Sequence, residues 1–142
     1  MKKIIIIFLS IFLFFNYAQS DDLRYTDYKS KLLNVSVDKK YKILKEISFA
    51  LEFENDIISS CVSYIKMWKE IKGEMCEKAL GRMKGMMNLM DILQSEEYRN
   101  SFKEVFTKID NYKVDKLMKE TENNTENLTD NISKLTFLIK NL

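Results

Sequence analysis

The chain contains no proline and only three glycines, at positions 73, 81 and 85, among its 142 residues. Tight hairpins between short strands depend on these two residue types, because proline presets the backbone of a turn and glycine adopts the positive φ that hairpin turns require. A chain with so few of them lacks the usual means of connecting many strands. We therefore expect an all-α protein.

Apolar residues recur at helical spacing in the first half of the chain, which supports this class. A weak apolar stripe covers residues 25–35. A long second helix, capped by Ser36 or Asp38, is expected to reach Lys72, with a break at residues 55–56 as the alternative.

The same spacing continues to the end of the chain. A third stripe covers residues 76–93, and a fourth, capped by Ser95, continues to residue 118. The last helix is expected to begin at Thr129 or Asp130. Together the stripes predict an up-and-down bundle of about four to five helices, with packing of the coiled-coil type between the longer ones.

The first twenty residues have the three parts of a cleavable secretory signal peptide. Lys2 and Lys3 form the basic start, residues 4–15 are apolar, and the sequence Ala-Gln-Ser at 18–20 precedes a suitable cleavage site before Asp21. Twelve helical residues rise about 18 Å, whereas the apolar core of a bilayer is about 30 Å thick. We therefore expect the leader to be cleaved, with an uncleaved signal anchor as the alternative.

Cleavage leaves a single helical domain over residues 21–142, which we expect to be secreted, or periplasmic in a Gram-negative bacterium, without a stable membrane anchor. The whole chain has 23 Lys and Arg against 21 Asp and Glu, and the leader removes two lysines. The mature domain thus carries equal numbers of both signs. Nucleic-acid binding relies on clustered basic residues that neutralise phosphates, so we expect no nucleic-acid partner.

The chain has no histidine and only two cysteines. This composition excludes His-based catalytic triads, HExxH zinc helices, zinc-finger ligand sets and the deaminase zinc site. The sequence also has no glycine-rich phosphate loop and no acids in EF-hand order. We therefore expect a protein that is not an enzyme and that binds neither a metal nor a cofactor.

Cys61 and Cys76 are the two thiols, and a secreted protein is expected to oxidise them, either to each other or across a dimer. On one continuous helix their Cα atoms would be about 22 Å apart, whereas a disulfide requires about 7 Å or less. A hairpin centred between them would turn near Trp68 and Lys69, where the sequence carries no turn signal. The spacing leaves their pairing open.

Four methionines fall on one face of the expected third helix: Met83, Met86, Met87 and Met90. Thioethers bind Cu(I), although such sites usually include histidine. Methionine also fills irregular gaps in helical cores, which is the simplest interpretation here. A third interpretation is an adaptable apolar groove, to which Phe49 and Phe53 of the second helix would contribute.

Four Asn-X-Ser/Thr sequons follow the leader, at Asn34, Asn123, Asn127 and Asn131. The last three are four residues apart, so they fall on one face of a helix. They fit glycans on the outer surface of a eukaryotic secreted protein. The alternative is a bacterial protein from an AT-rich genome that overuses asparagine.

These features lead to two hypotheses for function. The first is a secreted, non-catalytic helical protein that binds a protein partner or a cell surface. The alternative is a small carrier that holds a lipid-like ligand between its helices with aromatic and methionine side chains: Phe49, Phe53, Trp68, Met86, Met87, Phe102 and Phe106. A closed apolar cavity would favour the carrier, and a filled core would favour partner binding.

Overall fold

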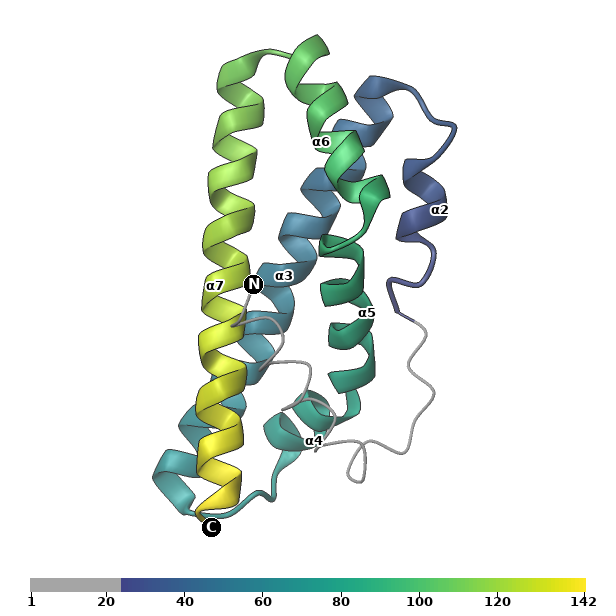
Figure 1. The fold of residues 1–142 in the computed structure, drawn as a ribbon. Coiled ribbons are helices and arrows are strands. Elements are labelled where there is room, and N and C mark those ends of the chain that lie inside the picture. The colour runs from purple at the N-terminus through teal and green to yellow at the C-terminus, as the bar shows by residue number, and fades with distance from the viewer. Residues whose placement is uncertain (1–23) are drawn as a thin grey trace.

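The computed structural model describes residues 24–142, so the predicted signal peptide lies outside the described residues. The described part contains six helices and no strand, which confirms the all-α class. The helices are α2 (Tyr28–Leu32), α3 (Val37–Trp68), α4 (Glu74–Gly81), α5 (Met83–Leu93), α6 (Glu96–Lys108) and α7 (Asn111–Lys140). They form the helical bundle shown in Figure 1.

Serine side chains cap the N-termini of two helices, as expected. The Ser36 hydroxyl accepts a hydrogen bond from the Lys39 backbone N–H at the start of α3. The Ser95 hydroxyl accepts one from the Tyr98 backbone N–H at the start of α6. Each serine satisfies one of the N–H groups that the first turn of a helix leaves without a partner.

α3 passes through residues 55–56 without a break but ends at Trp68, so the expected end at Lys72 is wrong. Lys69 adopts a left-handed conformation (φ 56°, ψ 31°), and its N–H donates to the carbonyl of Ile65. This single residue ends the helix and turns the chain back. A left-handed residue is usually glycine or asparagine, which is why the sequence carries no turn signal at this lysine.

Gly73 is required immediately before α4. Its φ is 114°, and a Cβ atom at this position would lie 2.9 Å from Cζ of Tyr64. Both the positive φ and the close aromatic ring demand a residue without a side chain. The chain can therefore return closely along the last turns of α3.

The apolar stripe over residues 76–93 forms two helices rather than the single helix that its spacing predicts. α4 ends at Gly81 and α5 begins at Met83, with Arg82 between them at φ −99° and ψ −1°. The Arg82 side chain pairs with the buried carboxylate of Glu54 on α3, to which we attribute the break. The described residues consequently contain one helix more than the expected maximum.

The last helix also begins earlier than expected, at Asn111 instead of near residues 129–130. A carboxylate oxygen of Asp110 accepts a hydrogen bond from the Tyr112 backbone N–H and caps α7. Residues 121–131, which are rich in threonine and asparagine, therefore lie in the interior of α7. Its helical form relies on packing against α3 rather than on intrinsic propensity, which is low for these residue types.

α3 and α7 lie side by side over most of their length (Figure 1). The side-chain amide of Asn124 donates to the Ser48 carbonyl at 3.2 Å, and that of Asn131 donates to Oδ1 of Asn55 at 2.7 Å. Both pairs are 76 residues apart in the sequence, so the two helices run in the same direction. The pairs are one heptad apart on each helix, as in coiled-coil packing.

The shorter helices α4, α5 and α6 carry the chain back from the end of α3 to the start of α7 (Figure 1). Buried apolar side chains from α2 to α7 form one core cluster. Because this return path is divided into three helices, α6 and the end of α5 face the upper half of α7 in Figure 1. The candidate site lies there.

Candidate functional site

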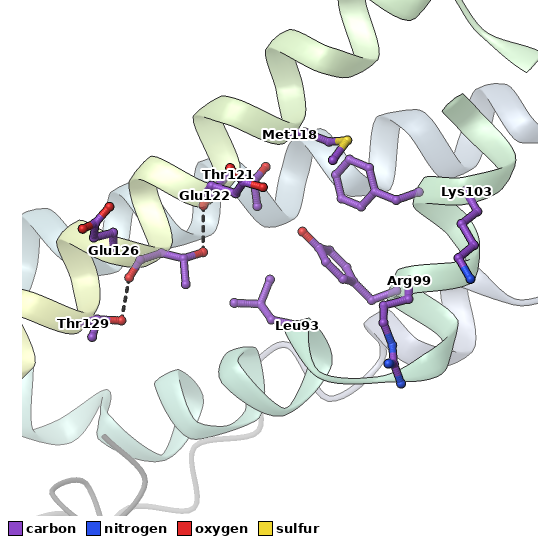
Figure 2. A pocket seen from close by; sticks show the side chains of 11 residues that line it. Leu93, Arg99, Lys103, Met118, Thr121, Glu122, Glu126 and Thr129 are labelled. Carbon is purple, nitrogen blue, oxygen red and sulfur yellow. Dashed lines mark hydrogen bonds between the residues drawn. The ribbon is translucent and has the colours of Figure 1, made fainter. Parts of the chain in front are cut away.

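A groove of about 550 Å³ opens to the surface between α7 and the junction of α5 and α6 (Figure 2). Its lining comes from the last residue of α5, from α6 and from α7, and most of it is apolar. The lining residues are Leu93, Tyr98, Arg99, Phe102, Lys103, Met118, Thr121, Glu122, Thr125, Glu126 and Thr129.

Three threonines of α7 form the floor of the groove: Thr121, Thr125 and Thr129. Each hydroxyl donates to the backbone carbonyl four residues earlier in α7, at 2.7 Å (two of these bonds are dashed in Figure 2). Because the polar atoms are satisfied within their own helix, the threonines contribute their methyl groups to the lining. A row of formally polar residues thus behaves as an apolar surface.

Tyr98 and Phe102 of α6 form the facing wall. Their rings meet edge to face, with centroids 5.1 Å apart and planes inclined by 72°. Burial raises the pKa of the Tyr98 phenol above its ordinary value, so this wall is neutral at physiological pH. The floor and the facing wall of the groove are therefore without charge.

Charged side chains flank the groove on both sides (Figure 2). Arg99 and Lys103 project from α6 and form a basic rim, whereas Glu122 and Glu126 project from α7 and form an acidic rim. The members of each pair are four residues apart, so they lie along one side of their helix. All four are exposed, which leaves them available to a bound molecule.

The methionine face of α5 lies in the core instead of lining the groove. Met83, Met86 and Met90 are fully buried, and Met87 is half-buried against the core cluster. Their placement agrees with the interpretation that methionine fills gaps between helices.

The aromatic residues that sequence reasoning grouped with these methionines lie elsewhere. Phe49 and Phe53 are 69% and 45% exposed on α3, and they line a separate depression to which none of the four methionines contributes. Trp68 is exposed at the end of α3, and Phe106 is exposed on α6. Of the side chains expected to hold an apolar ligand, Phe102 is the one that lines the groove.

Cys61 and Cys76 form a disulfide, with Cα atoms 4.6 Å apart. The hairpin between them turns at Lys69, so the geometric objection to their pairing is wrong. Both cysteines are fully buried between α3 and α4. The bond ties the end of α3 to the return path and is typical of proteins from oxidising compartments.

Sequence reasoning missed a buried ionic cluster at Glu54, which has no exposed surface. Arg82 Nε donates to both carboxylate oxygens at 2.9 and 2.8 Å, and the Tyr25 hydroxyl donates to one of them at 2.6 Å. The hydrogen bonds to Glu54 raise the pKa of Arg82, and burial together with the Glu54 hydrogen bond raises that of Tyr25. The cluster links three segments of the chain through one carboxylate.

A signal for this cluster exists in the sequence. Glu54 falls on the apolar stripe of α3 between Leu51 and Ile58, where a charge must be paired if it is buried. The identity of its partner could not be predicted, because Arg82 is reached only through the break between α4 and α5. The Tyr25 hydroxyl and the Arg82 guanidinium both donate to Glu54, so we assign the cluster a structural role.

The sequons occupy different surroundings. Asn34 is exposed in the link between α2 and α3, with φ at 52°, while Asn123 and Asn127 are exposed on α7. Asn131 is half-buried and turned toward Asn55 of α3, so the three sequons of α7 do not share one environment.

Comparison of the chain with family models, with curated proteins and with solved structures gives no significant match. Within residues 24–142, no group of three or more acidic or cysteine side chains is placed to hold a metal ion. No helix in the same range has the length and apolar character needed to cross a bilayer.

Proposed function

We propose that the chain is a secreted, non-catalytic binding protein whose groove receives an amphipathic helix of a macromolecular partner. The observation that carries this proposal is the combination of an apolar floor and wall with one basic and one acidic rim. A contiguous apolar surface framed by charged residues is typical of an interaction site.

The dimensions and charges of the groove favour a helix as the occupant. The floor from Thr121 to Thr129 extends about 12 Å, which matches two turns of a helix with apolar residues at i, i+4 and i+7. Acidic residues on one side of that stripe would meet the rim of Arg99 and Lys103. Basic residues on its other side would meet Glu122 on α7, and such complementarity sets specificity.

Two further observations support a secreted location. The Cys61–Cys76 disulfide is stable in an oxidising compartment, and none of the described helices suits a membrane span. The signal peptide expected in the first twenty residues agrees with both.

A designed helical peptide tests the proposal. It carries apolar residues at helical spacing, with glutamates along one flank of the stripe and lysines along the other. Two control peptides keep the same stripe but have only glutamates or only lysines on both flanks. We expect the mixed peptide to bind more tightly than either control, because each single-sign peptide places like charges against one rim. Equal affinities for all three would contradict the charge argument.

A matched pair of variants locates the binding site on α7. Thr125→Lys places a long charged side chain in the floor of the groove, whereas Asn127→Lys places the same side chain on an exposed position of the same helix. We expect Thr125→Lys to weaken peptide binding by about tenfold or more and Asn127→Lys to leave it unchanged. Equal effects of the two variants would place the contact elsewhere.

The alternative function, a carrier of an apolar ligand, is supported by the size of the groove. Its volume of about 550 Å³ lies within the range of about 300–1,000 Å³ that is common for small-molecule sites. A fluorescent long-chain fatty acid distinguishes the two functions. Binding of the fatty acid, blocked by Thr125→Lys, together with no binding of the mixed peptide, would replace our proposal with the carrier.

A further inference from the structure

Threonines and sequon asparagines alternate along the middle of α7. The floor residues are Thr121, Thr125 and Thr129, and Asn123 and Asn127 lie midway between them. Each residue of an α-helix turns by about 100°, so positions two apart point to nearly opposite sides. Both asparagines are exposed, and both therefore lie on the side of α7 that faces away from the groove.

Asn131 differs from these two because it takes part in the contact between α3 and α7. Its side-chain amide donates to Oδ1 of Asn55 at 2.7 Å, and the residue is half-buried. A glycan on this nitrogen would have to fit between the two longest helices of the bundle. The hydrogen bond directs this nitrogen toward α3, so a sugar ring on it would displace Asn55 and separate the two helices.

Asn34 resembles the exposed pair. It lies in the short link between α2 and α3, where its left-handed backbone conformation turns the chain. Asparagine is among the residues that tolerate this conformation. Glycans are carried by such exposed surface positions.

We propose that, in a eukaryotic secretory pathway, the chain carries N-linked oligosaccharides on Asn34, Asn123 and Asn127 and that Asn131 stays bare. The carbohydrate then covers the side of α7 opposite the groove. The donor is an oligosaccharide bound to a polyprenyl diphosphate. The bond between sugar C1 and the phosphate oxygen breaks, Nδ2 of asparagine forms a bond to C1 and loses one proton, and the polyprenyl diphosphate leaves with the electron pair.

The transfer takes place before α7 has folded. Thr125 and Thr129 are the hydroxyl residues of the sequons at Asn123 and Asn127, and in the folded helix both hydroxyls donate to backbone carbonyls. A chain glycosylated at 123 and 127 can still fold, because these positions are exposed. A chain glycosylated at Asn131 cannot close the contact with α3, so the folded, secreted protein lacks that glycan.

The test uses the full chain with its own leader, expressed in cultured insect cells and purified from the medium. Peptide-N-glycosidase converts each glycosylated asparagine to aspartate, and peptide mass spectrometry then identifies the converted positions. We expect aspartate at 34, 123 and 127 and asparagine at 131. Asn34→Gln, Asn123→Gln and Asn127→Gln should each reduce the intact mass by one glycan.

Ser133→Ala provides the matched control for the fourth sequon. It removes the acceptor motif at Asn131 but keeps the asparagine and its hydrogen bond to Asn55, and Ser133 itself is exposed. We expect this variant to show the same glycan masses as the unchanged protein. A glycan on Asn131 in the secreted protein, or its absence from any of the other three asparagines, would overturn the proposal.

Discussion

At the scale of single residues, Glu54 has the most demanding environment among the described side chains. Its carboxylate has no exposed surface and lies on a stripe of α3 that is otherwise apolar. A buried charge is tolerated only when it is paired and fully hydrogen-bonded. Arg82 and Tyr25 supply these bonds, and no buried side-chain polar atom in the described residues is left without a partner.

Glu54→Gln should therefore destabilise the fold strongly. The neutral amide leaves the Arg82 guanidinium, whose side chain is only 16% exposed, without its counter-charge. Loss of one partner of a buried ion pair typically costs about 3 kcal/mol or more. Urea denaturation measures the change, and the exposed neighbour Glu52→Gln, which should change the free energy of unfolding by less than about 0.5 kcal/mol, is the control. Similar unfolding midpoints for both variants would contradict the structural role of the cluster.

From the burial of the Tyr98 phenol, we expect the protein to lose stability at alkaline pH. Burial raises the folded pKa of this phenol above the unfolded value near 10. Below about pH 10 the ionisation of Tyr98 does not affect the free energy of unfolding. Above that pH the free energy of unfolding falls, because the unfolded chain releases the phenol proton that the folded protein retains.

This loss of stability can be measured as a fall in the urea unfolding midpoint as the pH rises from about 9 to about 11. Tyr98→Phe should make the decline less steep, whereas Tyr112→Phe, which alters a residue that is 77% exposed, should not. A decline of the same steepness in Tyr98→Phe and in the unchanged protein would show that this phenol is not responsible.

At the scale of the helices, Lys69 decides where α3 ends. A non-glycine residue in the left-handed conformation costs about 1–2 kcal/mol. Lys69→Gly should therefore raise the free energy of unfolding by up to about 1 kcal/mol, since glycine accepts this conformation but also gains freedom in the unfolded chain. Lys72→Gly removes the same charge at a position without positive φ and should lower stability. A loss of stability in Lys69→Gly would contradict the assignment of the turn.

The helix starts at Ser36 and Ser95 could be predicted from a local side chain, whereas the equally local cap at Asp110 was missed and the break between α4 and α5 could not be predicted. Ser36 and Ser95 act as caps because the hydrogen bond is confined to three neighbouring residues. The break at Arg82 depends on its contact with the distant Glu54, and the turn at Lys69 places a lysine in a left-handed conformation that glycine or asparagine usually adopts. Periodicity contains neither signal. α7 overrides the low helix propensity of its threonines through its packing against α3.

At the scale of the whole molecule, the groove results from the different paths of α6 and α7. The two helices are joined at residues 109–110 and diverge from this connection (Figure 1), and the Tyr98 hydroxyl of α6 still reaches Thr121 of α7. Tyr98 and Phe102 were predicted as part of an apolar helical stripe, but nothing in their spacing indicates that they line a groove together with the threonines of α7. The regular spacing of the methionines on α5 reflects their place in the core.

NMR of ¹³C-labelled methionine methyl groups tests most directly whether the groove is the contact surface. Met118 lines the groove, whereas Met86 is fully buried in the core, and Met118→Leu assigns the groove signal. On titration with the mixed-flank peptide, we expect the Met118 methyl signal to shift and the Met86 signal to stay in place. A shift of the Met86 and Met87 signals with no change at Met118 would exclude the groove as the contact surface and place the contact on α5.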